Sequence, residues 1–278
     1  MRKGVKTTIT YIAWYLILIF FFILCVEPVV WMVFGSFKDR AEFYANIWGP
    51  PKVYHFENYV KAWNNAGLGR KILNSIFVTF FALLISIPVN SCAAYVLARM
   101  RFKYAKLIYF YLLTGIMIPS GIMAIPTFSV ALRINLVNSL FGLVLIFAAQ
   151  SIAMGMFIMR SFFISLPKGL EEAALIDGCT RFKCFTHIIL PLTKPGIMTQ
   201  VIFSGLTIWN EYLLSSIMIR SENLQTIPLG LASFVGKYTV NYPELFAALV
   251  IVTVPVIIIY ILAQKSFIEG LSAGAIKG

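Results

Sequence analysis

Two acidic residues lie inside otherwise apolar stretches of the sequence, Glu27 in the first and Glu211 in the fifth. Charged groups are costly inside a bilayer and usually serve the movement of ions or solutes. Asn210 adds a second polar group directly beside Glu211. We predict that these three residues belong to a translocation path or a gate. The alternative is that the acids pair with bases near the ends of apolar runs, such as Arg133 or Arg220, and hold helices together.

Residues for metal or catalytic chemistry are few and poorly spaced. The sequence contains four cysteines and two histidines: Cys25, Cys92, Cys179, Cys184, His55 and His187. A zinc site needs closer cysteine pairs or histidine partners, so we expect reduced thiols and no metal site. The sequence has no G-x-x-x-x-G-K-[ST] phosphate loop, and no apolar run offers a Ser/His/Asp set or paired carboxylates. We therefore predict that the chain is not an enzyme and holds no cofactor.

The composition is that of a membrane protein. Hydrophobic residues make up 60% of the 278 residues and charged residues 12%, and the mean hydropathy is +0.86. A soluble domain carries about twice that share of charge. The net charge of +12 comes from bases near the ends of apolar runs, which is the pattern of membrane topology and not of nucleic-acid binding.

Six apolar runs are long enough to cross a bilayer as helices, which satisfy their own backbone groups. This predicts an all-α integral membrane fold in a single domain, residues 1–278. The predicted spans are 11–34, 72–98, 107–132, 139–159, 197–219 and 246–263. The first run is too long for the core of a signal peptide and has no small-residue cleavage site, so it is predicted to be retained.

The orientation follows from one short connection between the second and third spans. It holds Arg99, Arg101, Lys103 and Lys106 and no acid. Basic connections stay in the cytoplasm, so both termini are predicted to be cytoplasmic. The connection from Ser36 to Lys71 is then external, and its Phe56-Glu57-Asn58-Tyr59 segment is expected to start a short helix.

The most polar long connection lies between the fourth and fifth spans, residues 160–195, and has the sequence signals of two short helices. Pro167 suits a first helical turn, and Gly178 falls where a left-handed C-cap is needed. Thr180 can cap a second helix, which Pro191 is expected to end. A helix–turn–helix in this position needs a surface on which to dock.

The residues of this connection carry a resemblance to a known family. Glu172-Ala173-Ala174, then Gly178, then Ile188 and Leu190-Pro191 at fixed spacing resemble the EAA loop of binding-protein-dependent ABC importers. Sugar importers of that family also show a similar Trp-Asn-Glu-aromatic stretch, here at Trp209–Tyr212. The chain resembles the smaller permease subunit of the maltose-type carbohydrate importers over nearly its whole length.

The resemblance implies a role for the loop and a set of partners. The loop would be the coupling helix seated in a cleft of the ATP-hydrolysing subunit, through Glu172, Ala173, Ala174, Asp177 and Gly178. The implied partners are a second, homologous permease forming a heterodimer, two copies of the ATPase, and an extracytoplasmic sugar-binding protein. ATP and magnesium would bind the ATPase. The implied location is the bacterial inner membrane.

The C-terminal tail, residues 264–278, resembles the same subunit's ending in a Gly-Ala-x-Lys-Gly motif. By that resemblance Gly274, Ala275, Lys277 and Gly278 would contact the ATPase subunits. The glycines of the tail lead us to expect a flexible segment.

Three other functions compete with a sugar importer subunit. An ABC permease for a non-sugar solute would share every feature above. An ion-coupled secondary transporter would need midplane acids and broken helices in matching halves, which the sequence does not clearly show. A membrane-embedded enzyme is disfavoured by the missing catalytic residues.

Overall fold

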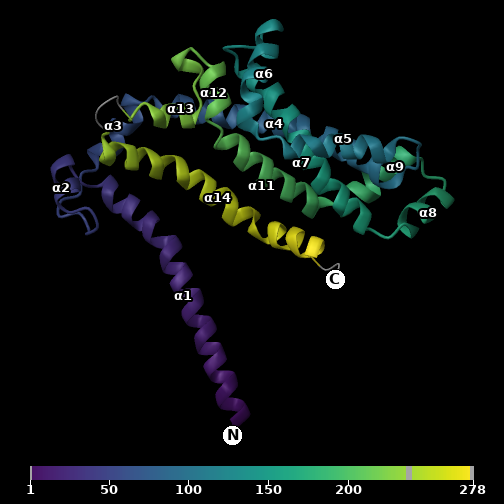
Figure 1. Ribbon diagram of the computed structural model, residues 1–278, viewed down its shortest axis with the longest axis horizontal. Coiled ribbons are helices and arrows are strands. Elements are labelled where there is room, and N and C mark those ends of the chain that lie inside the picture. Colours follow the sequence, from purple (N-terminus) through teal and green to yellow (C-terminus); the bar gives the residue numbers. More distant parts are fainter. Residues whose placement is uncertain (1, 236–239, 276–278) are drawn as a thin grey trace. The chain divides into compact units, whose positions relative to one another are not determined.

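The computed structural model describes residues 2–235 and 240–275, and the regular elements in this part of the chain are helices (Figure 1). The predicted all-helical fold is therefore confirmed. The helices are α1 (Arg2–Ser36), α2 (Arg40–Ala45), α3 (Glu57–Asn65), α4 (Leu68–Arg99), α5 (Ala105–Met117), α6 (Ser120–Arg133), α7 (Leu140–Ser165), α8 (Gly169–Ile176), α9 (Arg181–Cys184), the π-helix η1 (Phe185–Ile189), α10 (Leu190–Leu192), α11 (Lys194–Trp209), α12 (Leu213–Met218), the 3₁₀ helix η2 (Glu222–Leu224), α13 (Ile227–Ala232) and α14 (Tyr242–Ala275).

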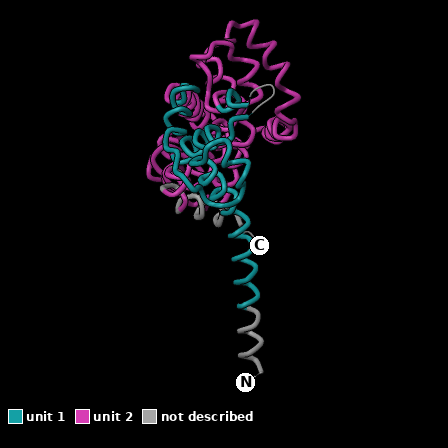
Figure 2. The backbone as a smooth tube through the Cα atoms, turned by 90° about the vertical axis from the view of Figure 1, so that its left-hand side faces the viewer, with its two compact units in different colours: residues 1–68, 231–254 teal, residues 69–230, 255–278 magenta. Residues whose placement is uncertain are grey.

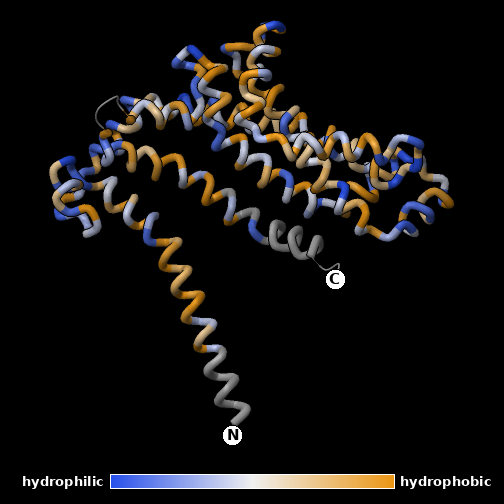
Figure 3. Tube along the Cα trace, viewed as in Figure 1, coloured by the Kyte–Doolittle hydropathy of each residue, from blue (hydrophilic) through white to orange (hydrophobic). Residues whose placement is uncertain are grey.

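Three of the described helices are long and apolar enough to cross a membrane on their own: α1 from Tyr11, α4 and α7. Hydrophobic residues dominate their length (Figure 3). Taken together, α5 and α6 are also long and apolar enough for a fourth span, but the pair is bent. The helices α11 and α14 supply further apolar segments, of which α14 qualifies only as a shorter apolar helix over Tyr242–Ile258.

The run predicted as one span over 107–132 is divided. The helices α5 and α6 meet at an angle of 104°, and Ile118 between them is extended, with φ −86° and ψ 118°. The cause is Pro119, because a proline ring disfavours helical backbone in the residue before it. Pro126, in contrast, lies inside α6, and Pro28, Pro88 and Pro255 also lie inside helices.

The chain forms two compact units, residues 1–68 with 231–254 and residues 69–230 with 255–278 (Figure 2). In the first unit, aromatic rings cluster at the C-terminal end of α1. The Trp31 ring meets Phe246 edge-on at 4.8 Å between centroids, and Phe43 stacks on Tyr242 at 5.2 Å. Apolar contacts of this kind are what fix the loop that follows α1.

That loop is also held by buried polar groups. The Lys38 amine donates to the carbonyl oxygens of Asn46 (2.5 Å) and Ile47 (3.3 Å), and burial lowers the pKa of Lys38. The Asn58 carboxamide donates to the backbone oxygens of Ser36 (2.9 Å) and Lys38 (2.8 Å). Asn58 belongs to α3, so the short helix expected after Phe56 is confirmed.

The second unit has two hydrophobic cores. The first lies among α4, α6, α7, α11 and α12, and the second among α4, α7, α8 and the segment from α9 to η1. Between α4, α7 and α11 the helices approach closely at Gly155. A Cβ atom there would clash with the Asn90 carboxamide and lie 2.6 Å from Gln200 Nε2. The glycine thus makes room for two amide side chains that are both fully buried.

Candidate functional site

The loop between α7 and α11 begins with α8, which ends in a left-handed turn at Gly178. The glycine has φ +78°, and its N–H donates to the Leu175 carbonyl at 3.1 Å. The Cys179 N–H donates to the Ala174 carbonyl at 2.9 Å. These two bonds form a Schellman motif, which satisfies carbonyls that the helix end leaves open. The predicted left-handed glycine cap is confirmed.

The second helix of the loop begins as predicted but does not end as predicted. The Thr180 hydroxyl accepts the Lys183 N–H at 3.3 Å and caps α9. Pro191 was expected to end this helix, and that is wrong. The chain stays helical through the π-helix η1 and α10, up to Leu192. A proline lacks the N–H of a regular turn and crowds the preceding one, and the wider π-turn just before Pro191 accommodates it.

The five residues predicted to couple to an ATPase do not share one surface. Glu172, Ala173, Asp177 and Gly178 are exposed, whereas Ala174 is buried in the second hydrophobic core. Ala174 therefore fixes α8 to its own chain. Contact of the five residues with an ATPase stays a prediction.

Sequence reasoning missed two large apolar side chains at the outer end of this loop. The Ile176 side chain, at the end of α8, is 86% exposed, and Phe182, in α9, is 73% exposed. Exposed apolar groups that gather in one place mark surfaces for a protein partner or a membrane. The sequence signal that could have identified them was the presence of two large apolar residues in the most polar connection of the chain.

A buried ion pair joins the loop to the end of α4. The Arg99 Nε atom lies 3.3 Å from Glu171 Oε1, and these side chains are 4% and 17% exposed. The same guanidinium donates from Nη2 to the Leu166 carbonyl at 2.8 Å, where α7 ends. One arginine thus holds both the start of the loop and the first turn of α8. The sequence suggested only a topological role for Arg99.

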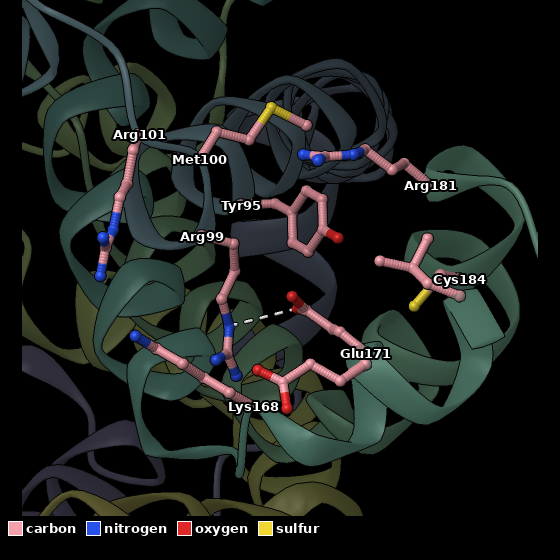
Figure 4. A pocket seen from close by; sticks show the side chains of 10 residues that line it. Tyr95, Arg99, Met100, Arg101, Lys168, Glu171, Arg181 and Cys184 are labelled. Atoms are coloured by element: carbon pink, nitrogen blue, oxygen red, sulfur yellow. Dashed lines mark ion pairs between the residues drawn. The ribbon is translucent and has the colours of Figure 1, made fainter.

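A cavity of about 260 Å³ opens beside this ion pair, and Figure 4 shows its lining side chains. Lys168, Arg101 and Arg181 contribute charge to its wall together with Arg99 and Glu171. The Cys184 thiol also lines it, and burial, with a smaller contribution from the negative charge of Glu171, raises the pKa of Cys184. A buried thiol with a raised pKa stays protonated at neutral pH, as expected for a structural cysteine.

The fifth predicted span is also broken, and Glu211 lies at the break. α11 ends at Trp209, and α12 begins at Leu213. The Glu211 carboxylate accepts the N–H groups of Leu214 (2.6 Å) and Ser215 (2.9 Å) and the Ser215 hydroxyl (2.8 Å). The expected continuous helix over 197–219 is therefore wrong, because this carboxylate supplies acceptors for the start of a new helix.

Neither base considered as a partner of Glu211 is paired with it. The ion pairs found among the described residues involve His55 and Arg99, not Arg133 or Arg220. The Asn210 side chain donates to the Leu206 carbonyl at 2.8 Å and is exposed. Glu27 lies on α1 with an exposed side chain. Their role in a path or gate stays a prediction.

The C-terminal tail differs from the flexible segment expected. The helix α14 runs on through Gly270 and Gly274 to Ala275, because helical hydrogen bonds along a continuous segment outweigh the low propensity of single glycines. Lys277 and Gly278 lie outside the described residues.

The four cysteines are not in disulfides, and no cluster of three metal-binding side chains occurs in the described part of the chain.

These features define a multi-span helical membrane protein with broken spans and an exposed loop helix. The family profile described as "Binding-protein-dependent transport system inner membrane component" matches residues 90–272. A probable ABC transporter permease of Bacillus subtilis is 36% identical over 90% of this chain and 83% of its own. A diacetylchitobiose uptake permease of Streptomyces coelicolor is 33% identical over 94% and 87%. The chain belongs to this family of inner membrane transport components.

Two further comparisons agree with the family and the fold. An arabinooligosaccharide transport permease of Bacillus subtilis is 32% identical and covers all of both chains. A chain in the crystal structure of a bacterial ABC transporter that imports alginate superimposes with a TM-score of 0.83 at 22% identity, over 94% of this chain and 98% of that one. The second similarity concerns the fold alone.

Proposed function

We propose that the chain forms half of the translocation pathway of an ATP-driven sugar importer in a bacterial inner membrane. The names of its relatives, which include permeases for diacetylchitobiose and arabinooligosaccharides, support sugar as the substrate class. A second permease completes the pathway, and a sugar-binding protein delivers the substrate from outside. One solved relative in fold is in complex with a periplasmic protein that holds an alginate pentasaccharide.

The observation that carries this proposal is the exposed end of the loop helix. Ile176 and Phe182 lie uncovered next to the Gly178 turn, on a loop fixed to α4 by Arg99. This arrangement suits the docking of the end of α8, held in a fixed position, into a cleft of a cytoplasmic ATPase. The loop is then cytoplasmic and both termini lie on the same side, with six spans between them. ATP and magnesium belong to two ATPase copies, and this chain holds no cofactor.

The proposal is tested by reconstitution in liposomes. The chain alone should neither hydrolyse ATP nor accumulate sugar, and a partner permease, two ATPase copies and a binding protein should together restore both activities. Arabinotriose, diacetylchitobiose and maltotriose are suitable sugars to test. Uphill uptake by the isolated chain that depends on an ion gradient would instead establish a secondary transporter, for which the two broken spans would be suited.

Replacing Ile176 with aspartate should weaken association with the ATPase at least tenfold. A side chain that is 86% exposed contributes little to the fold of the free chain, and a charge in an apolar contact is costly to desolvate. Co-purification of the ATPase at equal membrane level measures the effect. Val53→Asp is the matched control, because Val53 is an exposed apolar residue of the loop that follows α1. Full retention of the ATPase by the Ile176→Asp chain would contradict the docking role.

A further inference from the structure

A small hollow with a largely apolar wall and several polar side chains lies between α7 and α11 and extends to Glu211. Its volume is about 120 Å³. Gln150 and Ser151 line it from the middle of α7, and Ser204 and Thr207 line it from α11. Both helices are apolar for most of their length, so four polar side chains that meet at this depth are a local exception.

The hydroxyl groups of this hollow have spare capacity to accept hydrogen bonds. The Ser151 hydroxyl donates to the Phe147 carbonyl at 2.7 Å, and Thr207 donates to the Phe203 carbonyl at 2.8 Å. Each hydroxyl has one proton and two lone pairs, so both oxygens of these lining residues can still accept hydrogen bonds. Sugar hydroxyls are the matching donors.

Gln150 adds donors as well as an acceptor. Its carboxamide is exposed, and no other described residue hydrogen-bonds to it. A carboxamide offers two N–H donors and a carbonyl acceptor, and leaving these groups unsatisfied in hydrocarbon would be costly. Polar groups at membrane depth therefore face a bundle interior or a water-filled path, and not lipid.

The remaining wall supplies an apolar surface and a charge. The Phe203 ring is half-exposed at the rim, and sites for small molecules combine such aromatic surfaces with a few convergent polar groups. Glu211 is the one charged side chain among the residues lining the hollow. A sugar acid would bring its own carboxylate towards this negative charge, and like charges at a binding surface are strongly disfavoured.

We propose that the hollow between α7 and α11 is a subsite for one edge of a ring of an uncharged sugar during translocation. This inference rests on the proposed function and deepens it, since it gives this subunit direct contact with the sugar. The volume suits one edge of a ring or a hydroxymethyl group, so the rest of the sugar faces the partner permease. The subsite favours neutral sugars over uronates.

The first test compares two threonines of the same kind in the complete, reconstituted importer. Thr207→Val removes a hydroxyl that lines the hollow, and Thr114→Val removes one that also donates to its own helix backbone, at 2.6 Å, but does not line it. Combined with Gln150→Leu, Thr207→Val should lower the sugar transported per ATP at least tenfold and leave ATP hydrolysis near its normal rate. Thr114→Val should change neither quantity.

The second test measures occupancy directly. Thr207→Cys, with the four natural cysteines replaced by serine, should react with a water-soluble maleimide, and the transported trisaccharide should slow that reaction at least fivefold. An alginate trisaccharide at the same concentration should not slow it. A cysteine in place of Thr114 should show no protection by either sugar.

The outcomes separate the two proposals. If the unmodified importer transports none of the tested sugars, the proposed function and this inference both fail. If it transports sugar, but the Thr207→Val/Gln150→Leu importer keeps its normal yield per ATP and sugar does not protect position 207, the subsite alone is overturned. Equal protection by the uronate would overturn the preference for neutral sugars.

Discussion

Replacing Arg99 with methionine is expected to abolish sugar transport, although the chain still inserts in the membrane. The substitution removes the donor to the Leu166 carbonyl and leaves the carboxylate of Glu171 without its cation, in a site where that side chain is 17% exposed. Breaking a buried ion pair costs about 3–5 kcal/mol, and partial exposure of Glu171 places this case near the lower end. The substitution therefore destabilises α8 and the turn at Gly178.

The measurements are sugar uptake, ATPase co-purification and hydrogen exchange of the loop. We expect residues 166–178 to exchange at least tenfold faster in the Arg99→Met chain. Lys103→Met is the control, because Lys103 comes from the same basic connection but is exposed. It tests whether loss of positive charge alone disturbs the protein.

A double variant distinguishes the loss of the ion pair from the effect of leaving one buried charge without a partner. Arg99→Met with Glu171→Met removes both charges, and replacing both partners of a buried pair by apolar groups is often nearly neutral. The double variant should therefore recover most of the slow exchange of α8. If Arg99→Met alone exchanges and transports like the natural chain, this arginine does not position the loop.

The accuracy of the sequence predictions depended on how far apart the interacting residues lie. The Gly178 turn and the Thr180 cap were predictable, because each involves hydrogen bonds to residues within five positions. The bend at Pro119 also has a local cause, but residues 107–132 were predicted as a single span, and that prediction was wrong. Arg99, in contrast, acts on residues 67 and 72 positions further along the chain, and no periodicity or spacing signals that contact.

The break at Glu211 shows a different limit. The stretch over 197–219 reads as one apolar run, and a carboxylate inside it suggested either a solute path or a basic partner. The side chain instead accepts two backbone N–H groups of the helix that it starts. A helix start at such a site cannot be seen in hydropathy, because the pattern of apolar residues continues across it. The tail shows a related limit. Its glycines suggested flexibility, although the segment is part of the helix α14.

Replacing Gly178 with valine is expected to separate loop geometry from membrane assembly. Gly178 has φ +78°, and no atom outside its immediate neighbours lies within 4 Å of the position of a Cβ. A side chain there meets no obstacle, so its cost comes from the backbone. Left-handed backbone costs about 1–2 kcal/mol for an ordinary residue, and it is a true outlier for a β-branched one. That strain is too small to unfold the protein but large enough to open the Schellman turn.

Gly169 provides the matched control. A Cβ at Gly169 would also meet nothing within 4 Å, but Gly169 does not have a positive φ. Gly169→Val therefore adds the same side chain at the other end of α8, without the strain of a positive φ. A second control is Gly178→Asn, since asparagine tolerates the left-handed conformation better than other residues with a side chain.

We expect all three variants to reach the membrane and to associate with the second permease. The Gly178→Val importer should lose at least tenfold in sugar uptake and in ATPase retention, because the opened turn moves Ile176 relative to Phe182. Gly169→Val and Gly178→Asn should keep most of both activities. Equal uptake by Gly178→Val and Gly169→Val would mean that the left-handed turn does not set the docking geometry, and that the exposed apolar groups engage the ATPase without it.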